Sequence, residues 1–169
     1  MRSALPEAIC DTSPLQYLHQ LGVVHILPRL IGQIIVPPAV VDELAVGRSL
    51  GVNLPDLDDM TWIEVRPPSS APALPLVTDL GAGETEVLAL ALEYPGTPVI
   101  LDDGLARRTA RRLGLPLTGT LGLLLDARNA GIIPAVTPFL DQLQTLRFRL
   151  APATRAHVLD LAGETPGQR

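Results

Sequence analysis

Acidic side chains stand where apolar, strand-like runs of the sequence end. Asp11 follows the run "AIC", and Asp102 and Asp103 follow the run "VIL". Because the carboxyl ends of parallel strands meet at one edge of a sheet, these acids are expected to be neighbours. Glu43 and Glu84 fall in helical segments next to such strands and can join the same edge. The sequence therefore predicts a cluster of carboxylates contributed by four separate elements.

Carboxylates crowded into a poorly solvated cleft repel one another and raise one another's pKa. A divalent cation removes that cost, and all-oxygen ligands suit the hard ions Mg²⁺ or Mn²⁺. The three histidines, His19, His25 and His157, are scattered without metal-binding spacing, which argues against zinc. A metal held by carboxylates can lower the pKa of a bound water and stabilise a phosphate under in-line attack. Phosphodiester hydrolysis is the chemistry that this pattern favours.

Each of these acids also has a purely structural interpretation. Asp11 can belong to a turn and helix cap, Glu43 can be a solvated helix residue, and Glu84 can be a first-turn partner of the helix dipole. For Glu43 or Glu84 considered alone, the structural interpretation is favoured over a role in a metal site. Taken together, acids that recur at the ends of buried strands favour a metal site.

Composition narrows the choice of function. The chain is 47% hydrophobic and 18% charged, which suits a well-covered α/β protein. All thirteen basic residues are arginines, so mechanisms that need a lysine, such as a Walker loop or a Schiff base, are excluded. The net charge of −5 argues against a broadly basic surface for nucleic acid, although a local arginine patch can still engage phosphates. Cys10, the only cysteine, is interpreted as a core residue rather than a catalytic thiol.

The length of 169 residues fits one domain, which we expect to cover residues 1–169. No apolar stretch is long enough to span a membrane, and the opening residues lack the features of a signal peptide. A cytoplasmic protein is therefore expected.

Strand and helix patterns alternate along the chain. Ser13 is predicted to cap the first helix, with Pro14 at its first position and Gly22 after its end. The segment 48–82 is predicted to be a long surface excursion that contains a Pro/Ser loop at 66–75. Alternation of this kind predicts an α/β fold with a mostly parallel sheet flanked by helices. Strands are predicted at 7–10, 33–37, 62–65, 97–103, 115–120 and 148–150, and helices at 14–21, around 23–32, at 37–47, 81–96, 104–114 and 121–131, from about 138, and at the end of the chain.

Five blocks of the sequence occur in the order that is typical of one family. They are "DTSPLQYL", "VPPAVVDEL", "DLGAGETEVLALALE", "VILDDGLARRTARRLGL" and "GTLGLLLDARNAGII". With these blocks the chain resembles the PIN-domain proteins, specifically the DUF3368 branch related to the VapC toxins, from about Ile9 to Gly163. The resemblance implies an α/β/α sandwich and a metal-dependent endoribonuclease that acts on RNA, uses Mg²⁺ or Mn²⁺, pairs as a homodimer and is inhibited by a small antitoxin protein. It also implies that a helical extension over about 138–163 exceeds the better-known VapC proteins and serves contacts between subunits.

The same resemblance assigns roles to individual residues. It matches Asp11 to the first PIN aspartate and Glu43 to the acid of the "xxEL" helix. Glu84 is preferred over Glu86 as the third acid, because Ala89 and Ala91 then match the small residues of PIN helices. Asp103 is preferred over Asp102 as the fourth acid by its match to the "T-x-D" pattern. Ser13 matches a small hydroxyl residue that can orient the first aspartate, and the glutamate at position 84 departs from the usual aspartate.

The arginines of the segment 104–113 are candidates for contact with RNA phosphates. Arg107, Arg108, Arg111 and Arg112 are expected to point outward, and the first three are the predicted RNA-binding residues; a plain solvated helix face is the alternative. Two other functions stay open. A non-enzymatic member could keep the fold for binding protein or RNA, and another acid-cluster enzyme could hydrolyse small phosphate esters.

Overall fold

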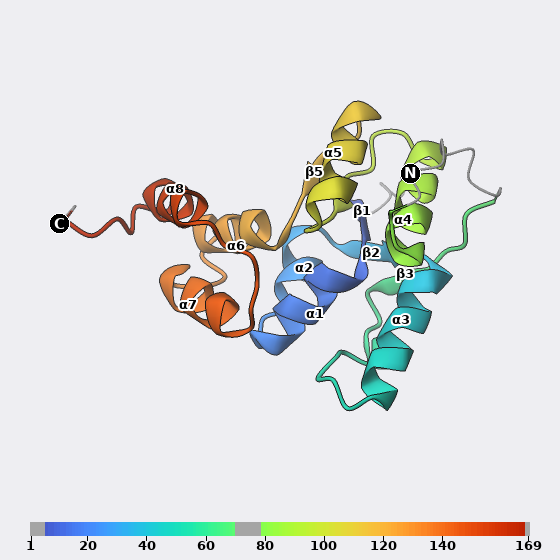
Figure 1. The fold of residues 1–169 in the computed structure, drawn as a ribbon, viewed down its shortest axis with the longest axis horizontal. Coiled ribbons are helices and arrows are strands. Elements are labelled where there is room, and N and C mark those ends of the chain that lie inside the picture. The colour runs from blue at the N-terminus through green and yellow to red at the C-terminus, as the bar shows by residue number, and fades with distance from the viewer. Residues whose placement is uncertain (1–5, 70–78, 168–169) are drawn as a thin grey trace, which may run out of the picture.

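The computed structural model describes residues 6–69 and 79–167 and has a parallel sheet at its centre (Figure 1). Part of the expected Pro/Ser loop, residues 70–75, lies outside the described residues. The five strands run in the order β3-β2-β1-β4-β5, and every neighbouring pair is parallel. The strands are β1 (Glu7–Cys10), β2 (Gln33–Val36), β3 (Ile63–Val65), β4 (Val99–Ile100) and β5 (Leu117–Thr118).

Helices cover both faces of this sheet, so the predicted α/β/α architecture is confirmed (Figure 1). Helices α3 and α4 pack against each other, while α2 packs against β2 and α6. The C-terminal helix α8 packs against α6. The helices are α1 (Thr12–Gln20), α2 (Ile26–Leu30), α3 (Pro38–Ser49), α4 (Ala82–Glu93), α5 (Gly104–Arg112), α6 (Thr120–Asn129), α7 (Thr137–Thr145) and α8 (Pro152–Ala162), and a 3-10 turn spans Leu57–Asp59.

The central strands are apolar because both of their faces are buried. Ile9 of β1 lies between Ile35 of β2 and Val99 of β4, and all three side chains are inaccessible to solvent. Such strands read as continuous hydrophobic runs rather than as alternating patterns. Cys10 is part of this core, and burial raises the pKa of its thiol well above the usual value. The interpretation of Cys10 as a core residue is therefore confirmed.

The strand order places a topological switch point between β1 and β4. From β1 the chain builds β2 and β3 on one side of the sheet, and it then crosses to build β4 and β5 on the other side. In open parallel sheets, ligands bind at the carboxyl ends of the strands where the order reverses in this way. The residues that follow β1 and β4 therefore occupy the position at which such a fold presents its functional groups.

Two local predictions are wrong. The first helix begins at Thr12 and its N-cap is Asp11, so Ser13 and Pro14 lie inside its first turn rather than at its start. Residues 148–150 form no strand, because the Phe148 N–H is taken up by the turn that ends α7 and the residues after it are irregular. In that turn Arg147 N–H donates to the carbonyl of Gln144, and Phe148 N–H donates to the carbonyl of Leu143.

This pair of hydrogen bonds defines a Schellman motif at the end of α7. Its left-handed position usually holds glycine, but here it holds Arg147, with φ of 65°. Arg147 is the only residue other than glycine with positive φ in the described ranges. The ring of the next residue, Phe148, packs edge-on against Tyr17 of α1, with ring centroids 5.0 Å apart. The turn is thereby fixed beside the start of the first helix.

None of the helices in the described ranges combines the length and the apolar character that crossing a membrane requires.

Candidate active site

Asp11 lies at the switch point, directly after β1. Its backbone N–H donates to the carbonyl of Ile100 in β4, which fixes it between the two central strands. Only 3% of the residue is exposed. As the N-cap of α1 it could accept from the helix, yet its carboxylate makes no capping hydrogen bond. Oδ1 is buried and has no hydrogen-bond partner among the described residues.

Glu43 reaches the same place from the middle of α3. Its Oε1 accepts a hydrogen bond from the Gly83 backbone N–H at 2.9 Å, and its Oε2 accepts one from Thr12 Oγ1 at 2.5 Å. Thr12 begins α1 and Gly83 lies in the first turn of α4. A single carboxylate therefore ties three helices together.

Gly83 leaves the space in which the carboxylates of Asp11 and Glu43 meet. A Cβ atom at this position would lie 2.9 Å from Asp11 Oδ1 and 2.8 Å from Glu43 Oε2. Neither distance is compatible with a side chain, and the backbone of Gly83 is ordinary helix. The glycine is therefore explained by close approach of acidic side chains rather than by chain flexibility.

The two candidate acids of α4 lie on different sides of the helix and do different things. Glu84 turns back to accept from the backbone N–H of Gly81, the N-cap residue of its own helix, at 3.0 Å, and it faces the switch point. Glu86 accepts from the Ala39 backbone N–H at 2.9 Å, at the start of α3. The carboxylate of Glu86 is thus used to cap a neighbouring helix, whereas Glu84 stands with the other acids.

Asp102 and Asp103 follow β4 and are also held by backbone donors. Asp102 Oδ1 accepts from the Thr120 N–H at 2.8 Å, and its Oδ2 accepts from Thr120 Oγ1 at 2.6 Å. Asp103 is the N-cap of α5 and accepts from the Ala106 N–H at 2.9 Å. Gly119 makes room for this arrangement, because a Cβ there would lie 2.8 Å from Asp102 Oδ1.

A cavity of about 440 Å³, here named the acidic cavity, opens beside these acids. Ser13 lines this cavity although it does not cap α1. The residues that line it include Ser13, Tyr17, Glu84, Asp102, Asp103 and Arg149.

Burial and mutual repulsion shift the acids away from their usual protonation behaviour. The pKa of Asp11 is raised to about 7, mainly by burial and also by the nearby carboxylates of Glu84, Glu43 and Asp102, while the hydrogen bond from the Thr12 amide acts in the opposite direction. Burial also raises the pKa of Glu84, and Asp103 and Glu43 contribute to that rise. The pKa of Asp102 is raised by burial and held back by Thr120 and Arg107. These carboxylates therefore lie within electrostatic reach of one another, as crowded acids do.

The donor set suits a hard divalent cation, and the spare oxygen of Asp11 is the atom most available to one. In the described ranges, no group of three or more His, Cys, Asp or Glu side chains is already placed to hold a metal ion. The hydrogen bonds above explain why, since Glu43, Glu84 and Asp103 each turn an oxygen toward a helix N-terminus. A cation would replace those donors as the partner of the carboxylates.

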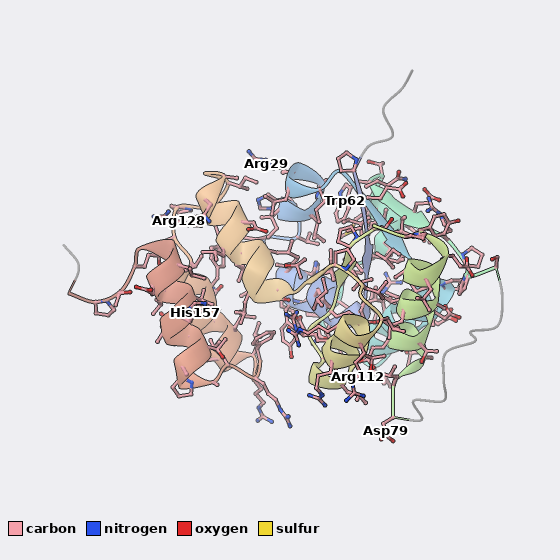
Figure 2. The ribbon with its side chains drawn as sticks, turned by 90° about the horizontal axis from the view of Figure 1, so that it is seen from above. Arg29, Trp62, Asp79, Arg112, Arg128 and His157 are labelled. Carbon is pink, nitrogen blue, oxygen red and sulfur yellow. The ribbon has the colours of Figure 1, made fainter. Side chains whose placement is uncertain are left out.

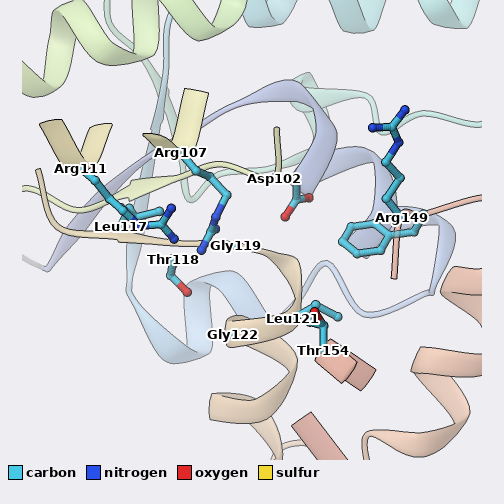
Figure 3. Close-up of a pocket in the computed structure, with 11 residues that line it drawn as sticks. Asp102, Arg107, Arg111, Leu117, Thr118, Gly119, Leu121, Gly122, Arg149 and Thr154 are labelled. Atoms are coloured by element: carbon cyan, nitrogen blue, oxygen red, sulfur yellow. The ribbon is translucent and has the colours of Figure 1, made fainter. Parts of the chain in front are cut away.

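Helix α5 departs from the expected pattern of four outward arginines. Arg107 is half-buried, and its Nη1 donates to the carbonyl of Leu101 at 2.7 Å. Arg111 lies beside it, and both line a second cavity next to Asp102 (Figure 3). Arg108 and Arg112 are exposed, as predicted, and Arg112 lies at the outer side of the molecule (Figure 2). The prediction that Arg107 points outward is wrong, because its guanidinium group turns inward to donate to the backbone carbonyl of Leu101 after β4.

Sequence reasoning missed several residues that shape the site. Thr12 rather than Ser13 bonds a candidate acid, and Thr120 holds Asp102 although its pattern suggested only a strand-to-helix cap. Gly83 gave no signal, because a glycine in a helix start has several explanations. Arg149 reaches the acidic cavity from the C-terminal part of the chain, which the order of the sequence does not reveal.

Comparison with known proteins agrees with this geometry. The family model DUF3368, described as a PIN domain, matches residues 7–164. A search of curated proteins finds no significant match. Among solved structures, the chain is similar to a PilT N-terminus domain protein, SSO1118, from the hyperthermophilic archaeon Sulfolobus solfataricus P2. The two share 21% sequence identity with a TM-score of 0.51, over 69% of this chain and 89% of that chain.

The fold and the acidic edge thus define a PIN domain, which is a nuclease-type fold. The chain belongs to the DUF3368 family. The family predicted from the five sequence blocks is therefore confirmed, and the likeness to the archaeal protein supports the fold alone.

The raised pKa of Asp11 predicts how the metal-free protein responds to pH. In the unfolded chain this carboxyl has a pKa of about 3.9, so between about pH 4 and 7 the folded state holds the proton more tightly. Stability therefore falls as the pH rises through this window, and the whole cost is present above about pH 7. Asp11→Asn should raise the free energy of unfolding by roughly 1–3 kcal/mol at pH 8 and by much less at pH 4.

Urea unfolding at the two pH values, with a chelator present, measures this difference. Asp42→Asn is the matched control, because it removes an exposed carboxylate from α3 beside Glu43. An Asp11 variant that is no more stable than the parent at pH 8 would contradict the electrostatic description of the site.

Proposed function

We propose that this protein is a metal-dependent endoribonuclease that hydrolyses RNA phosphodiester bonds. One observation carries the proposal: among the described residues, a buried carboxylate oxygen of Asp11 has no hydrogen-bond partner at the switch point of a PIN-domain sheet, and further acids lie within electrostatic reach of it. A folded protein that keeps such an oxygen unsatisfied bears a real energetic cost. A bound cation would remove that cost, and a nuclease-type fold supplies the reason to bind one.

Asp11, Glu43, Glu84 and Asp103 are the residues that would hold Mg²⁺ or Mn²⁺. Asp102 is the alternative to Asp103, because it is within electrostatic reach of Asp11, whereas Asp103 is within reach of Glu84. Glu86 is less suited, since it caps α3. When bound, the cation would supply an activated water and would neutralise charge on the phosphate.

The side chains of this protein would contribute orientation and proton handling. Thr120 donates to both oxygens of Asp102, which favours the ionised form of that carboxylate and fixes it beside the acidic cavity. The Asp11 carboxyl, whose pKa is about 7 without a cation, would release its proton on binding one. Ser13 lines the same cavity and can donate a hydrogen bond to a water or to a phosphate oxygen there.

The alternative is a PIN domain that binds RNA or protein without cleaving it. The hydrogen bonds made by Glu43, Glu84 and Asp103 favour this alternative, because helix amides already stabilise these carboxylates without a cation. Calorimetric titration with Mn²⁺ separates the two functions. No binding at low millimolar concentration would favour the non-catalytic module.

Gly83 offers a test of metal binding that is independent of catalysis. Gly83→Ala favours the helix by about 1 kcal/mol in propensity but introduces a Cβ between Asp11 and Glu43. We expect the variant to fold and to bind Mn²⁺ at least about tenfold more weakly, because the carboxylates can no longer approach each other. Calorimetry measures the affinity, and thermal unfolding without metal is the control for the fold. Unchanged Mn²⁺ affinity would show that these two acids do not bind a cation jointly.

Asp11→Asn tests catalysis itself. We expect it to abolish Mn²⁺-dependent cleavage of a single-stranded RNA, with a loss of at least about a hundredfold, while the fold is retained. Gel analysis of a labelled oligonucleotide measures cleavage, and Asp42→Asn serves as the control because Asp42 is exposed outside the acidic cavity. Cleavage that persists in the Asp11 variant at parental rates would rule out the assignment.

A role as the toxin of a VapBC-like pair is part of the proposal and rests on the family resemblance. The partner would be a small antitoxin protein, and a homodimer of this chain would be its target. Exposed apolar side chains support an interface: Val46 and Leu50 of α3 are 58% and 77% exposed, and the adjacent Val52 is 44% exposed. We therefore expect the isolated chain to sediment as a dimer at micromolar concentration, and Leu50→Glu to shift it toward the monomer. A parent chain that sediments as a monomer would contradict the homodimer.

A further inference from the structure

The turn after α7 brings two arginines to the carboxylate edge from the far end of the chain. Arg147 and Arg149 line the acidic cavity, although they lie more than a hundred positions after Asp11. The contact between Phe148 and Tyr17 holds the turn there. Arg147 keeps a left-handed backbone that glycine would adopt at lower energy. Residues with strained backbone are frequent at functional sites, where the role of the side chain can outweigh the cost of the backbone conformation.

A second cavity of about 470 Å³, here named the arginine cavity, adjoins the acidic cavity. Both cavities are lined by Asp102, Phe148 and Arg149, so they meet at these residues. Arg107 and Arg111 lie together on one side of the arginine cavity, and Arg149 lies on the other side of Asp102 with its guanidinium group directed away from them (Figure 3). Arginine side chains therefore lie on both sides of Asp102, where the two cavities meet.

These arginines lack ion-pair partners among the described residues. Arg107, Arg111, Arg147 and Arg149 form none of the ion pairs found in the described part of the chain. Burial lowers the pKa of Arg107, and the like charge of Arg111 lowers it further, so the two guanidinium groups repel each other. The carboxylate of Asp102 attracts Arg107 and offsets part of its charge. The remaining positive charge beside the two connected cavities suits an anion with several negative charges.

Two helix starts add to the positive potential of the arginine cavity. Leu121 and Gly122 lie in the first turn of α6 and Thr154 lies in the first turn of α8, and all three line the cavity. The amide groups at helix N-termini attract phosphates. Gly122 keeps a side chain off the wall of the cavity, because a Cβ there would lie 2.5 Å from Thr118 Oγ1.

We propose that Arg107 and Arg111 of α5, with Arg147 and Arg149 of the α7–α8 turn, bind consecutive phosphates of a single-stranded RNA that crosses Asp102 from the acidic cavity into the arginine cavity. This inference rests on the proposed function, since it assigns the strand path on either side of the cleaved phosphate. A strand is the anion that fits, because its phosphates are spaced along a chain and the arginines lie on both sides of the junction. The overall charge of −5 then confines RNA to this one place on the protein.

Binding without cleavage tests the strand path. The probe is a fluorescein-labelled oligouridylate of about 12 nucleotides, measured by anisotropy with the full chain and EDTA present. Arg111→Gln and Arg149→Gln should each weaken binding about tenfold and reduce the salt dependence by about one phosphate contact. Arg112→Gln is the matched control, because it removes the same charge from the exposed side of α5 (Figure 2), and it should change the affinity less than about twofold. Arg107 is left intact, since its bond to the Leu101 carbonyl supports the fold.

Arg147→Gly separates a binding role from a structural one. Glycine relieves the left-handed backbone, so the melting temperature should rise by about 3 °C while RNA binding weakens severalfold. Equal weakening by Arg111→Gln and Arg112→Gln, or unchanged binding in both the Arg111 and the Arg149 variants, would overturn the strand path. Arginine-dependent binding by a chain that never cleaves RNA would support the path and contradict the nuclease function. RNA cleavage with an unchanged KM in the Arg111 and Arg149 variants would support the nuclease function and contradict the strand path.

Discussion

The carboxylates at the switch point repel one another, and the elements around them supply the hydrogen-bond donors that offset this repulsion. Three of the acids accept hydrogen bonds from groups at helix N-termini. Glu43 accepts from α1 and α4, Glu84 accepts from the start of its own helix, and Asp102 accepts from α6. These donors are mainly helix N-termini, whose partial positive charge favours a nearby carboxylate. Among these acids, Asp11 alone keeps a buried oxygen without a hydrogen-bond partner in the described part of the chain. The helices around the sheet are therefore arranged as electrostatic supports as well as packing layers.

The clustered carboxylates also need space, which two glycines provide. Gly83 and Gly119 lie where a Cβ atom would come within 3 Å of a carboxylate oxygen, and neither has a positive φ. The rest of the core is ordinary by comparison, with close-packed Ile, Leu and Val side chains around β1 and β2. The demanding positions in this fold are thus the two glycines next to the acids rather than the large hydrophobic residues.

The sequence was sufficient to predict the architecture and the acidic edge, because both depend on local patterns. Buried runs followed by acids predict where Asp11 and Asp102 must lie once the strands are parallel, and the order of the motifs predicts the family. It failed where a contact joins distant segments. The turn at 146–149 has the β-propensity of "FRL", but the end of α7 and the contact of Phe148 with Tyr17 decide its shape. Likewise, nothing local indicates that Arg107 turns inward to the Leu101 carbonyl.

The lengths of the outer strands bear on how this protein can associate. β3 and β5 form the two edges of the sheet in the described ranges, and they contain three and two residues. An edge this short exposes too few unpaired N–H and C=O groups to template the addition of a strand from another chain. The molecule is therefore protected against edge-to-edge aggregation and amyloid-like pairing. Any specific assembly has to form through its helices, whose side chains, unlike a bare backbone edge, can distinguish one partner from another.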